Sequence, residues 1–341
     1  MRVAMYYNNK DIRIEDIPKP KISPHELLVK TMACGICGSD VMEWYRIKNA
    51  PRVLGHEMTG EIVEVGKDVK KFKIGDRVFV SHHVPCNKCR YCLDGNHTVC
   101  ETLHRTNFDP GGFSEFVRIP KINVEFGTFL LPDEISFEDG TFIEPLGCVI
   151  RGQRRANVKK GHTVLVIGSG ISGILHIQLA RVLGAKKIIA TDVNEYRMKT
   201  AKKFGADEVI NAKEDVHSRV KEVNEGRLAD RVIVCTGAIS AIQQALKSVD
   251  LGGVILFFAP TEPDIDIPLP FNEFWSSQVI LTSTYAAVPT DIKEAIELIR
   301  SHKVNVHDMI THRLSLTETG LGFQLVADAK ESMKVIIEPY R

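Results

Sequence analysis

The sequence predicts an α/β protein with two domains of different architecture. Short alternating strands, broken by glycine and proline, occupy about the first 150 residues, as in a partly closed β-barrel. After them, short apolar strands alternate with helical segments, which is the pattern of a doubly wound parallel sheet. The length of 341 residues also exceeds what one hydrophobic core usually supports. We expect domains at 1–147 and 148–286, with 287–341 returning to the first domain.

The composition is that of an ordinary soluble protein. Hydrophobic residues make up 44% and charged residues 26%, and the net charge of +1 offers no basic surface for nucleic acid or an anionic membrane. No apolar run reaches the roughly 18 residues that a bilayer span needs, and the N-terminus lacks a signal-peptide pattern. The cysteines cluster as metal ligands do, instead of forming a disulfide framework. These features predict a cytoplasmic protein without membrane or nucleic-acid partners.

The first stretch with chemical meaning contains a thiol, an imidazole and a carboxylate. Cys37 is followed within about twenty residues by His56 and Glu57, and this mixed donor set suits zinc. A catalytic zinc takes three protein ligands and keeps one position open. Cys37 and His56 supply two of them. The third is either Glu57 or a distant residue, for which Glu144 is the best candidate.

A second cysteine cluster has the spacing C-x2-C-x2-C-x7-C. Four thiolates so close in sequence can surround one tetrahedral zinc and leave no open position, which makes a structural site. An iron–sulfur cluster is the rival interpretation, but the fourth cysteine lies too far along the chain and no proline follows it. We therefore expect a structural zinc lobe at about 84–102, whose ligands are Cys86, Cys89, Cys92 and Cys100.

A glycine-rich turn opens the second domain. The apolar strand 162–167 leads into Gly168-Ser169-Gly170-Ile171-Ser172-Gly173, and a helix and a further strand follow. In this strand–turn–helix arrangement, Gly168 allows the tight turn and Gly170 lets the backbone approach a pyrophosphate. Gly173 lets the helix pack closely against the strand. The helix N-terminus offers free N–H groups to the phosphates. The turn therefore predicts a dinucleotide site.

Asp192, at the end of the next strand, decides between the two nicotinamide cofactors. Its carboxylate can accept hydrogen bonds from the adenosine ribose and repels a 2′-phosphate, which favours NAD over NADP. Arg197 stands against this choice, because an arginine could bind that phosphate or simply stack on adenine. Ser169, Ile171 and Thr236 complete the predicted cofactor-binding set.

The remaining elements are predicted from apolar periodicity. In the first domain we expect strands at 2–6, 26–32, 59–66 and 75–80. In the second, six strands at 162–167, 187–191, 208–210, 231–235, 254–258 and 279–282 suffice for two mononucleotide halves, with helices at about 174–180, 214–225 and 239–248. Segment 291–302 has a helical period, and the tail contains a strand at 335–337.

Taken together, the four-cysteine lobe, the Gly55-His56-Glu57 motif and the downstream dinucleotide turn carry a family resemblance. The sequence resembles the zinc-dependent medium-chain alcohol dehydrogenases over essentially its whole length. It is most similar to the polyol (sorbitol or L-iditol) and threonine dehydrogenases, because Glu144 stands where classical members have a cysteine ligand. The resemblance implies a GroES-like β-barrel catalytic domain, a Rossmann NAD-binding domain, two zinc ions per chain, and a homotetramer or homodimer.

The resemblance also implies roles for individual residues. Cys37 and His56 would bind the catalytic zinc, with Glu57 as a ligand or an aid to ligand exchange, and Glu144 on the zinc or its water. Ser39 would carry the alcohol proton outward. Asp40 would orient the imidazole of His56, as carboxylates beside metal-bound histidines generally do.

Two positions depart from the family pattern. Met42 stands where many members have a histidine that completes the proton path, and a thioether cannot carry a proton. Arg151 replaces another usual histidine. Elsewhere we expect buried packing for Cys34, Cys148 and Cys235, and solvated side chains for His82, His83, Arg46 and Lys48. Trp44, Tyr45 and Phe108 suit a substrate cleft and a plain core equally well.

The predicted function is zinc-dependent transfer of a hydride from a secondary hydroxyl of a polyol or sugar-like alcohol to NAD, which gives the ketone. A dehydrogenase of threonine or of a simple secondary alcohol is the alternative. A zinc-binding scaffold or nucleic-acid module built on the lobe is a different class, and the near-zero net charge disfavours it.

Overall fold

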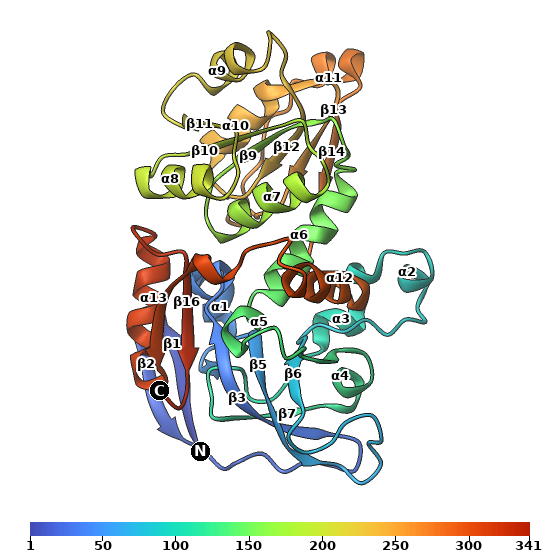
Figure 1. Ribbon diagram of the computed structural model, residues 1–341, viewed down its shortest axis with the longest axis vertical. Coiled ribbons are helices and arrows are strands. Elements are labelled where there is room, and N and C mark those ends of the chain that lie inside the picture. Colours follow the sequence, from blue (N-terminus) through green and yellow to red (C-terminus); the bar gives the residue numbers. More distant parts are fainter. The chain divides into compact units, whose positions relative to one another are not determined.

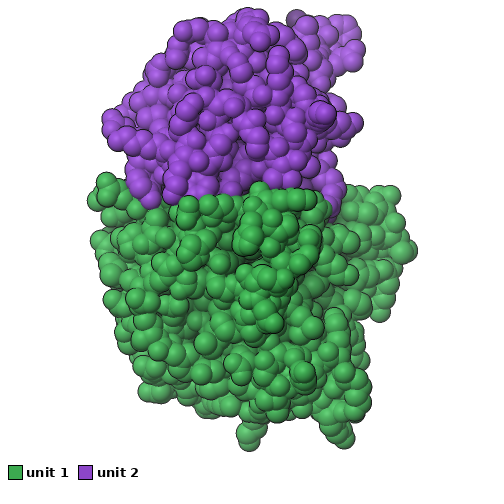
Figure 2. Space-filling view, viewed as in Figure 1, with its two compact units in different colours: residues 1–147, 286–341 green, residues 148–285 purple.

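The computed structural model describes all 341 residues, and the chain divides into two compact units. Unit 1 contains residues 1–147 and 286–341, and unit 2 contains residues 148–285 (Figure 2). Each unit has its own hydrophobic cluster of buried side chains.

Unit 1 is built mainly from β-strands. A sheet of seven strands has the order β15-β16-β3-β5-β6-β8, with β7 beside β3, and a smaller sheet has the order β2-β1-β4. The strands are β1 (Arg2–Asn8), β2 (Asp11–Asp16), β3 (Leu27–Gly35), β4 (Arg52–Val53), β5 (Glu57–Val65), β6 (Arg77–Val80), β7 (Phe116–Ile119), β8 (Thr128–Leu130), β15 (Ile310–Ser315) and β16 (Lys334–Glu338). The four strands predicted in the first domain are present, and the strand predicted at 335–337 is β16, which pairs antiparallel with β3.

The helices of unit 1 are short, apart from those of its last segment. They are α1 (Glu43–Arg46), α2 (Arg90–Leu93), α3 (Glu101–Arg105), α4 (Lys121–Phe126), α5 (Phe137–Gly140), α12 (Pro289–Arg300) and α13 (Thr319–Asp328), with 3-10 turns η1 (Gly38–Val41), η2 (Ile47–Asn49), η3 (His97–Val99), η4 (His307–Met309) and η5 (Leu316–Glu318). Helix α12 is the one predicted at 291–302. It begins with Pro289 at its first turn, where the missing N–H costs no hydrogen bond. Helix α6 (Ile143–Arg155) starts in unit 1 and ends in unit 2.

Unit 2 is a six-stranded parallel sheet with the order β11-β10-β9-β12-β13-β14. Helices cover both faces of this sheet (Figure 1). The strands are β9 (Thr163–Ile167), β10 (Lys187–Asp192), β11 (Glu208–Asn211), β12 (Ala229–Val234), β13 (Val249–Phe257) and β14 (Ile280–Ser283). The helices are α7 (Ile171–Val182), α8 (Glu195–Lys203), α9 (Val216–Val223), α10 (Ile239–Ser248) and α11 (Phe271–Ser277).

The strand order of unit 2 is that of two mononucleotide-binding halves joined at β9 and β12. The central strand β9 is buried at all five positions, as expected for a strand with helices on both faces. The six predicted strands are all present. Sequence reasoning missed α8, whose charged residues hide its helical period, although Asn194 caps its start by accepting the N–H of Tyr196.

Candidate functional site

The strand pairing of unit 1 brings the first group of metal-ligand residues together. Cys37 lies two residues after the end of β3 and caps the 3-10 turn η1, while Glu57 begins β5 and His56 directly precedes it. Because β3 and β5 are antiparallel neighbours, with Gly35 opposite Glu57, the two chain segments meet at one end of the sheet. The ligand atoms of Cys37, His56 and Glu57 all lie within 4.8 Å of one another. This sulfur, nitrogen and oxygen set fits a zinc ion.

Asp40 supports both of the non-acidic ligands. It is fully buried, its Oδ2 accepts the backbone N–H of Cys37 at 3.0 Å, and its Oδ1 lies 3.3 Å from Nδ1 of His56. Burial disfavours the charge, but His56 and Arg46 hold the pKa of Asp40 below its usual value. The ionised carboxylate can therefore fix the orientation of the imidazole and leave Nε2 for the metal.

Arg46 is tied into this cluster, so the expectation of a solvated charge was wrong. Its Nη2 donates to Oγ of Ser39 at 2.8 Å and lies 3.2 Å from Oδ1 of Asp40, while its Nε donates to the backbone oxygen of Ser39 at 2.9 Å. Oγ of Ser39 in turn lies 3.4 Å from Sγ of Cys37. Lys48 is exposed, as expected.

Glu57 carries an ion pair that no sequence motif indicated. Its Oε2 accepts a hydrogen bond from Nζ of Lys334 on β16, and the side chains are 1% and 0% exposed respectively. Nζ also lies 4.9 Å from the ring centroid of Phe142. The pair fits only because Gly35 has no side chain: a Cβ there would come within 2.5 Å of both Glu57 Oε2 and Lys334 Cε.

Glu144 occupies a different place from Glu57. It lies in the first turn of α6 and is 8% exposed, but it is not part of the group whose ligand atoms lie within 4.8 Å of one another. Its role beside the metal thus remains a prediction.

His82 lies next to the cluster, which corrects the expectation of a solvated histidine. Its ring centroid lies 4.8 Å from that of His56 and 3.8 Å from that of His83, and both residues are partly buried. Burial and the neighbouring cations keep the pKa of His82 well below its usual value, so its imidazole is neutral. Phe108, 2% exposed, packs edge-on against His82.

The four cysteines of the lobe form a second cluster. Their sulfur atoms also lie within 4.8 Å of one another, and the Cys89–Cys92 and Cys86–Cys100 sulfur pairs are both 3.6 Å apart. Sulfurs at the corners of a tetrahedron around zinc, each about 2.3 Å from the metal, stand about 3.8 Å apart. All eight cysteines are free of disulfides. The geometry fits a closed zinc site.

Backbone N–H groups prepare this cluster for thiolates. The N–H of Cys89 donates to Sγ of Cys86 at 3.3 Å, and that of Cys86 donates to Sγ of Cys100 at 3.5 Å. Although burial opposes ionisation, the backbone N–H groups of Cys86 and Leu103 and the thiols of Cys86 and Cys89 lower the pKa of Cys100 to about 6. Burial and the neighbouring thiols raise the pKa of Cys92 to about 12. A bound cation is needed to ionise all four together.

The glycine-rich turn of unit 2 has the geometry that its sequence predicted. Gly168 has φ +91°, in the left-handed region, and a Cβ on Gly173 would come within 2.0 Å of the carbonyl oxygen of Gly168. Gly170 caps the start of α7, and Thr236 packs against Gly168. The turn therefore requires glycine at 168 and 173, and it leads directly into the first, unpaired N–H groups of α7.

Asp192 and Arg197 both lie next to this turn. The carboxylate of Asp192 accepts the N–H of Ser169 at 2.8 Å and that of Asn194 at 2.9 Å, so it is held rigidly at the end of β10. The guanidinium of Arg197 lies about 3.9 Å from where a Cβ of Gly170 would stand, and its Nε is buried without a hydrogen-bond partner.

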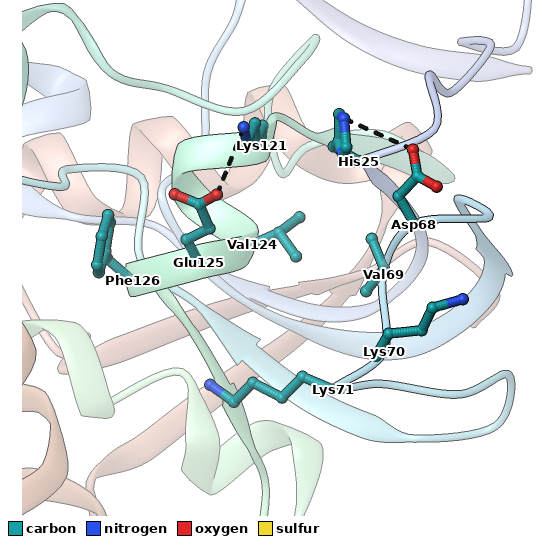
Figure 3. A pocket seen from close by; sticks show the side chains of 9 residues that line it. All are labelled: His25, Asp68, Val69, Lys70, Lys71, Lys121, Val124, Glu125 and Phe126. Carbon is teal, nitrogen blue, oxygen red and sulfur yellow. Dashed lines mark ion pairs between the residues drawn. The ribbon is translucent and has the colours of Figure 1, made fainter.

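A pocket of about 430 Å³ elsewhere in unit 1 contains none of the predicted site residues (Figure 3). Charged side chains on its rim pair with each other: His25 with Asp68 at 3.6 Å, and Lys121 with Glu125 at 3.7 Å. Lys70 and Lys71 also line the pocket and form no ion pair there, and we assign the pocket no function.

Comparison with known proteins agrees with this geometry. The model of the alcohol dehydrogenase GroES-like domain matches residues 23–126, and the zinc-binding dehydrogenase model matches residues 172–301. The sorbitol dehydrogenase of Bacillus subtilis is 33% identical, and the alignment covers 100% of this chain and 98% of that protein. The sorbitol dehydrogenase of Mus musculus is 32% identical over 96% of this chain and 93% of that protein.

The chain belongs to the zinc-dependent alcohol dehydrogenase family. Its curated relatives place it in the polyol-type branch, as the sequence resemblance predicted. Among solved structures, the 2R,3R-butanediol dehydrogenase of Bacillus subtilis superposes with a TM-score of 0.87 at 27% identity, over 99% of each chain. The predicted fold class, a GroES-like domain with a Rossmann sheet, is confirmed. The chain is thus an oxidoreductase of the alcohol dehydrogenase type.

No helix of the structure is long and apolar enough to span a bilayer.

Proposed function

We propose that this dehydrogenase oxidises a secondary hydroxyl of a polyol or sugar-like alcohol, with NAD as hydride acceptor and zinc at the Cys37–His56–Glu57 cluster. The observation that carries the proposal is that this mixed donor set stands together with a carboxylate, Asp40, that orients its histidine. The relatives named sorbitol dehydrogenase and butanediol dehydrogenase favour a substrate with neighbouring hydroxyls.

The cofactors supply the chemistry that side chains cannot. Zinc, when bound, acts as a Lewis acid that makes a hydroxyl proton easier to lose, and NAD, when bound, accepts the hydride. Cys37, His56 and Glu57 would hold the metal, with Glu144 as the second acidic group available to it. The cysteines of the lobe would hold a structural zinc.

The protein's own contribution is positioning and proton transfer. Ser39 relays the substrate's hydroxyl proton: its Oγ, held beside Cys37 by Nη2 of Arg46, accepts that proton while its own hydroxyl proton passes to the next acceptor. Asp40 keeps the ring of His56 in place. Met42, at the end of η1, cannot pass the proton on, so its onward route runs through another group or water.

The cofactor preference follows from Asp192. Both of its oxygens are fixed by backbone N–H groups, so the carboxylate stays at the end of β10, where it would meet the adenosine ribose. A fixed negative charge there disfavours a 2′-phosphate. We expect Arg197, which lies beside Gly170, to bind a phosphate of the cofactor or to stack on its adenine, and Thr236 to complete the site.

Two further proposals concern the state of the protein in the cell. We propose a cytoplasmic location, because eight free cysteines in metal-type clusters suit a reducing compartment. We also propose a homodimer or homotetramer, with no nucleic-acid or membrane partner. Its support is the exposed apolar surface near the edge strand β14, where Phe271 is 75%, Trp275 72% and Ile280 57% exposed.

The test is NAD reduction with sorbitol, xylitol, galactitol, 2,3-butanediol, threonine and 2-butanol, before and after treatment with a chelator. The proposal expects turnover of at least one polyol that is lost with the metal and restored by zinc, with NAD preferred to NADP. Turnover of threonine or 2-butanol alone would contradict the polyol assignment. A chelator-resistant activity would contradict the role of the metal.

A further inference from the structure

We propose that Arg46 and Arg52 form an oxyanion site beside the catalytic cluster, so that the favoured polyol carries a phosphate or carboxylate group. The inference rests on the proposed function and narrows its substrate class. It starts from an imbalance of charge in the loop that joins Cys37 to His56.

Arg46 uses only one edge of its guanidinium toward the metal-binding loop. Nε and Nη2 are occupied by Ser39 and Asp40, whereas Nη1 donates no hydrogen bond. The side chain is 15% exposed and its guanidinium lies 4.8 Å from the ring centroid of Tyr45. One pair of N–H donors is thus held in a fixed direction beside Ser39, without a partner.

Arg52 supplies a second guanidinium, whose charge interacts with those of both Arg46 and Asp40. It stands on β4, four residues before His56, opposite Tyr6 of β1. Its side chain is partly buried and forms no hydrogen bond or ion pair. Burial and the positive charge of Arg46 lower the pKa of Arg52. Two neighbouring guanidinium groups repel each other, and partial burial reduces the solvation that would screen them.

The acidic groups nearby do not balance these two charges. Asp40 is already shared by Cys37, His56 and Arg46. Glu43, on α1, is exposed and forms no ion pair with either arginine. His82 is neutral. The site therefore lacks one anion.

An oxyanion of the substrate would supply that charge. Arginine presents paired N–H donors whose geometry matches phosphate and carboxylate. The free edge of Arg46 is one hydrogen bond away from Ser39, which itself contacts Cys37. An anionic group held there would leave a hydroxyl elsewhere on the same polyol to reach the metal cluster.

The experiment compares sorbitol 6-phosphate, gluconate and sorbitol as substrates of the holoenzyme and of Arg52→Gln, Arg52→Lys and Arg13→Gln. Arg13 is the matched control, an exposed arginine on β2 of the same unit. We expect one of the anionic compounds to be preferred to sorbitol. In Arg52→Gln the ratio of kcat/KM for that compound to kcat/KM for sorbitol should fall about 10- to 100-fold, mainly through KM, because one charged hydrogen-bonded contact is lost. Arg52→Lys should retain part of the preference and Arg13→Gln all of it.

Two additional measurements separate the possible sources of the anion. The Kd of NADH, measured by fluorescence, should be the same in all variants; a rise in Arg52→Gln alone would assign the arginine to the cofactor diphosphate and overturn the proposal. Calorimetric titration of inorganic phosphate should show binding to the wild type that Arg52→Gln weakens at least tenfold. This titration tests the oxyanion site even if no polyol is oxidised.

The remaining outcomes distinguish failure of the oxyanion site from failure of the proposed polyol dehydrogenase function. Oxidation of sorbitol without any preference for sorbitol 6-phosphate or gluconate would overturn the oxyanion site and leave the polyol dehydrogenase standing. An equal loss of kcat/KM for charged and neutral substrates in Arg52→Gln would show that the arginine is merely structural. Phosphate binding without turnover of any polyol would support the site and contradict the proposed function.

Discussion

The two metal-type clusters of unit 1 differ in where their ligands and the groups that hold those ligands come from. In the lobe, the four ligands come from one short segment, and backbone N–H groups of that same segment donate to their sulfurs. In the Cys37 cluster, the ligands come from the ends of two strands, and the groups that hold them include Arg46 and Lys334. A closed site needs only its own ligands. A catalytic site needs, in addition, groups that keep its ligands in place while one coordination position stays open.

The largest effect should follow loss of a lobe ligand. Cys100→Ser removes one of four thiolates, and binding of a structural zinc contributes on the order of 10 kcal/mol to the folding of the segment that it closes. We expect zinc content to fall from two to one per chain and amide exchange of residues 84–102 to become fast. Exchange in β9 of unit 2 is the internal control. Protection of the lobe in the zinc-depleted variant would show that its fold does not depend on the metal.

Loss of a ligand in the Cys37 cluster should lower the activity strongly and change the stability of the fold little. Cys37→Ala should also bind one zinc per chain, but kcat/KM should fall about 10⁴-fold, which corresponds to about 5.5 kcal/mol of transition-state stabilisation. The surrounding strands stay paired through β3 and β5. Denaturation by urea should therefore change little. A loss of stability as large as that of Cys100→Ser would erase the distinction between the two sites.

Lys334 tests whether the catalytic cluster depends on distant support. In the metal-free protein, Lys334→Met leaves the carboxylate of Glu57 buried without its partner, which typically costs about 3–5 kcal/mol. We expect that loss in the free energy of unfolding measured with urea. The double variant Lys334→Met/Glu57→Gln should recover much of it, because the uncompensated charge is gone, and Lys10→Met on the surface should have no effect. A change below about 0.5 kcal/mol in Lys334→Met would mean that Glu57 is stabilised otherwise.

The smallest expected effect is a loss of folding stability at low pH. Two causes of this loss must be separated, because low pH both releases metal from thiolates and protonates buried histidines. His176 on α7 is fully buried, and burial lowers its pKa to about 3. In the unfolded chain a histidine has a pKa of about 6.5. Below that pH the unfolded state therefore binds a proton that His176 in the folded state does not bind. The contribution of His176 is therefore complete above pH 6.5 and lost progressively as the pH falls toward 3.

At pH 5 this loss should amount to about 2 kcal/mol, from about 1.4 kcal/mol for each pH unit below 6.5. Urea denaturation of the wild type and of His176→Leu between pH 7 and pH 5 measures it: the variant should have the flatter profile. The loss that persists in the variant then belongs to the metal sites together with the other buried histidines, His82 and His83. Equal slopes in the two proteins would show that His176 titrates normally.

The sequence by itself determined the features that arise within short segments. The spacing of Cys86, Cys89, Cys92 and Cys100 predicted a cluster that the fold indeed assembles, because ligands so close along the chain can hardly lie far apart in space. The turn from Gly168 to Gly173 and the six strands of unit 2 were predictable for the same local reason: the requirements of a tight turn and the apolar period of a buried strand are visible in a few residues.

Only the tertiary structure decided which groups surround Cys37 and His56. Arg46 and His82 were expected to be solvated, because most arginine and histidine side chains outside a recognised motif face water. In the fold, Arg46 at the end of α1 reaches back to Asp40 and Ser39, and the pairing of β6 with β5 brings His82 next to His56. Lys334 lies 277 residues from Glu57 along the chain. No local pattern can reveal such a partner, since the pairing of β16 with β3 and of β3 with β5 is a property of the sheet as a whole.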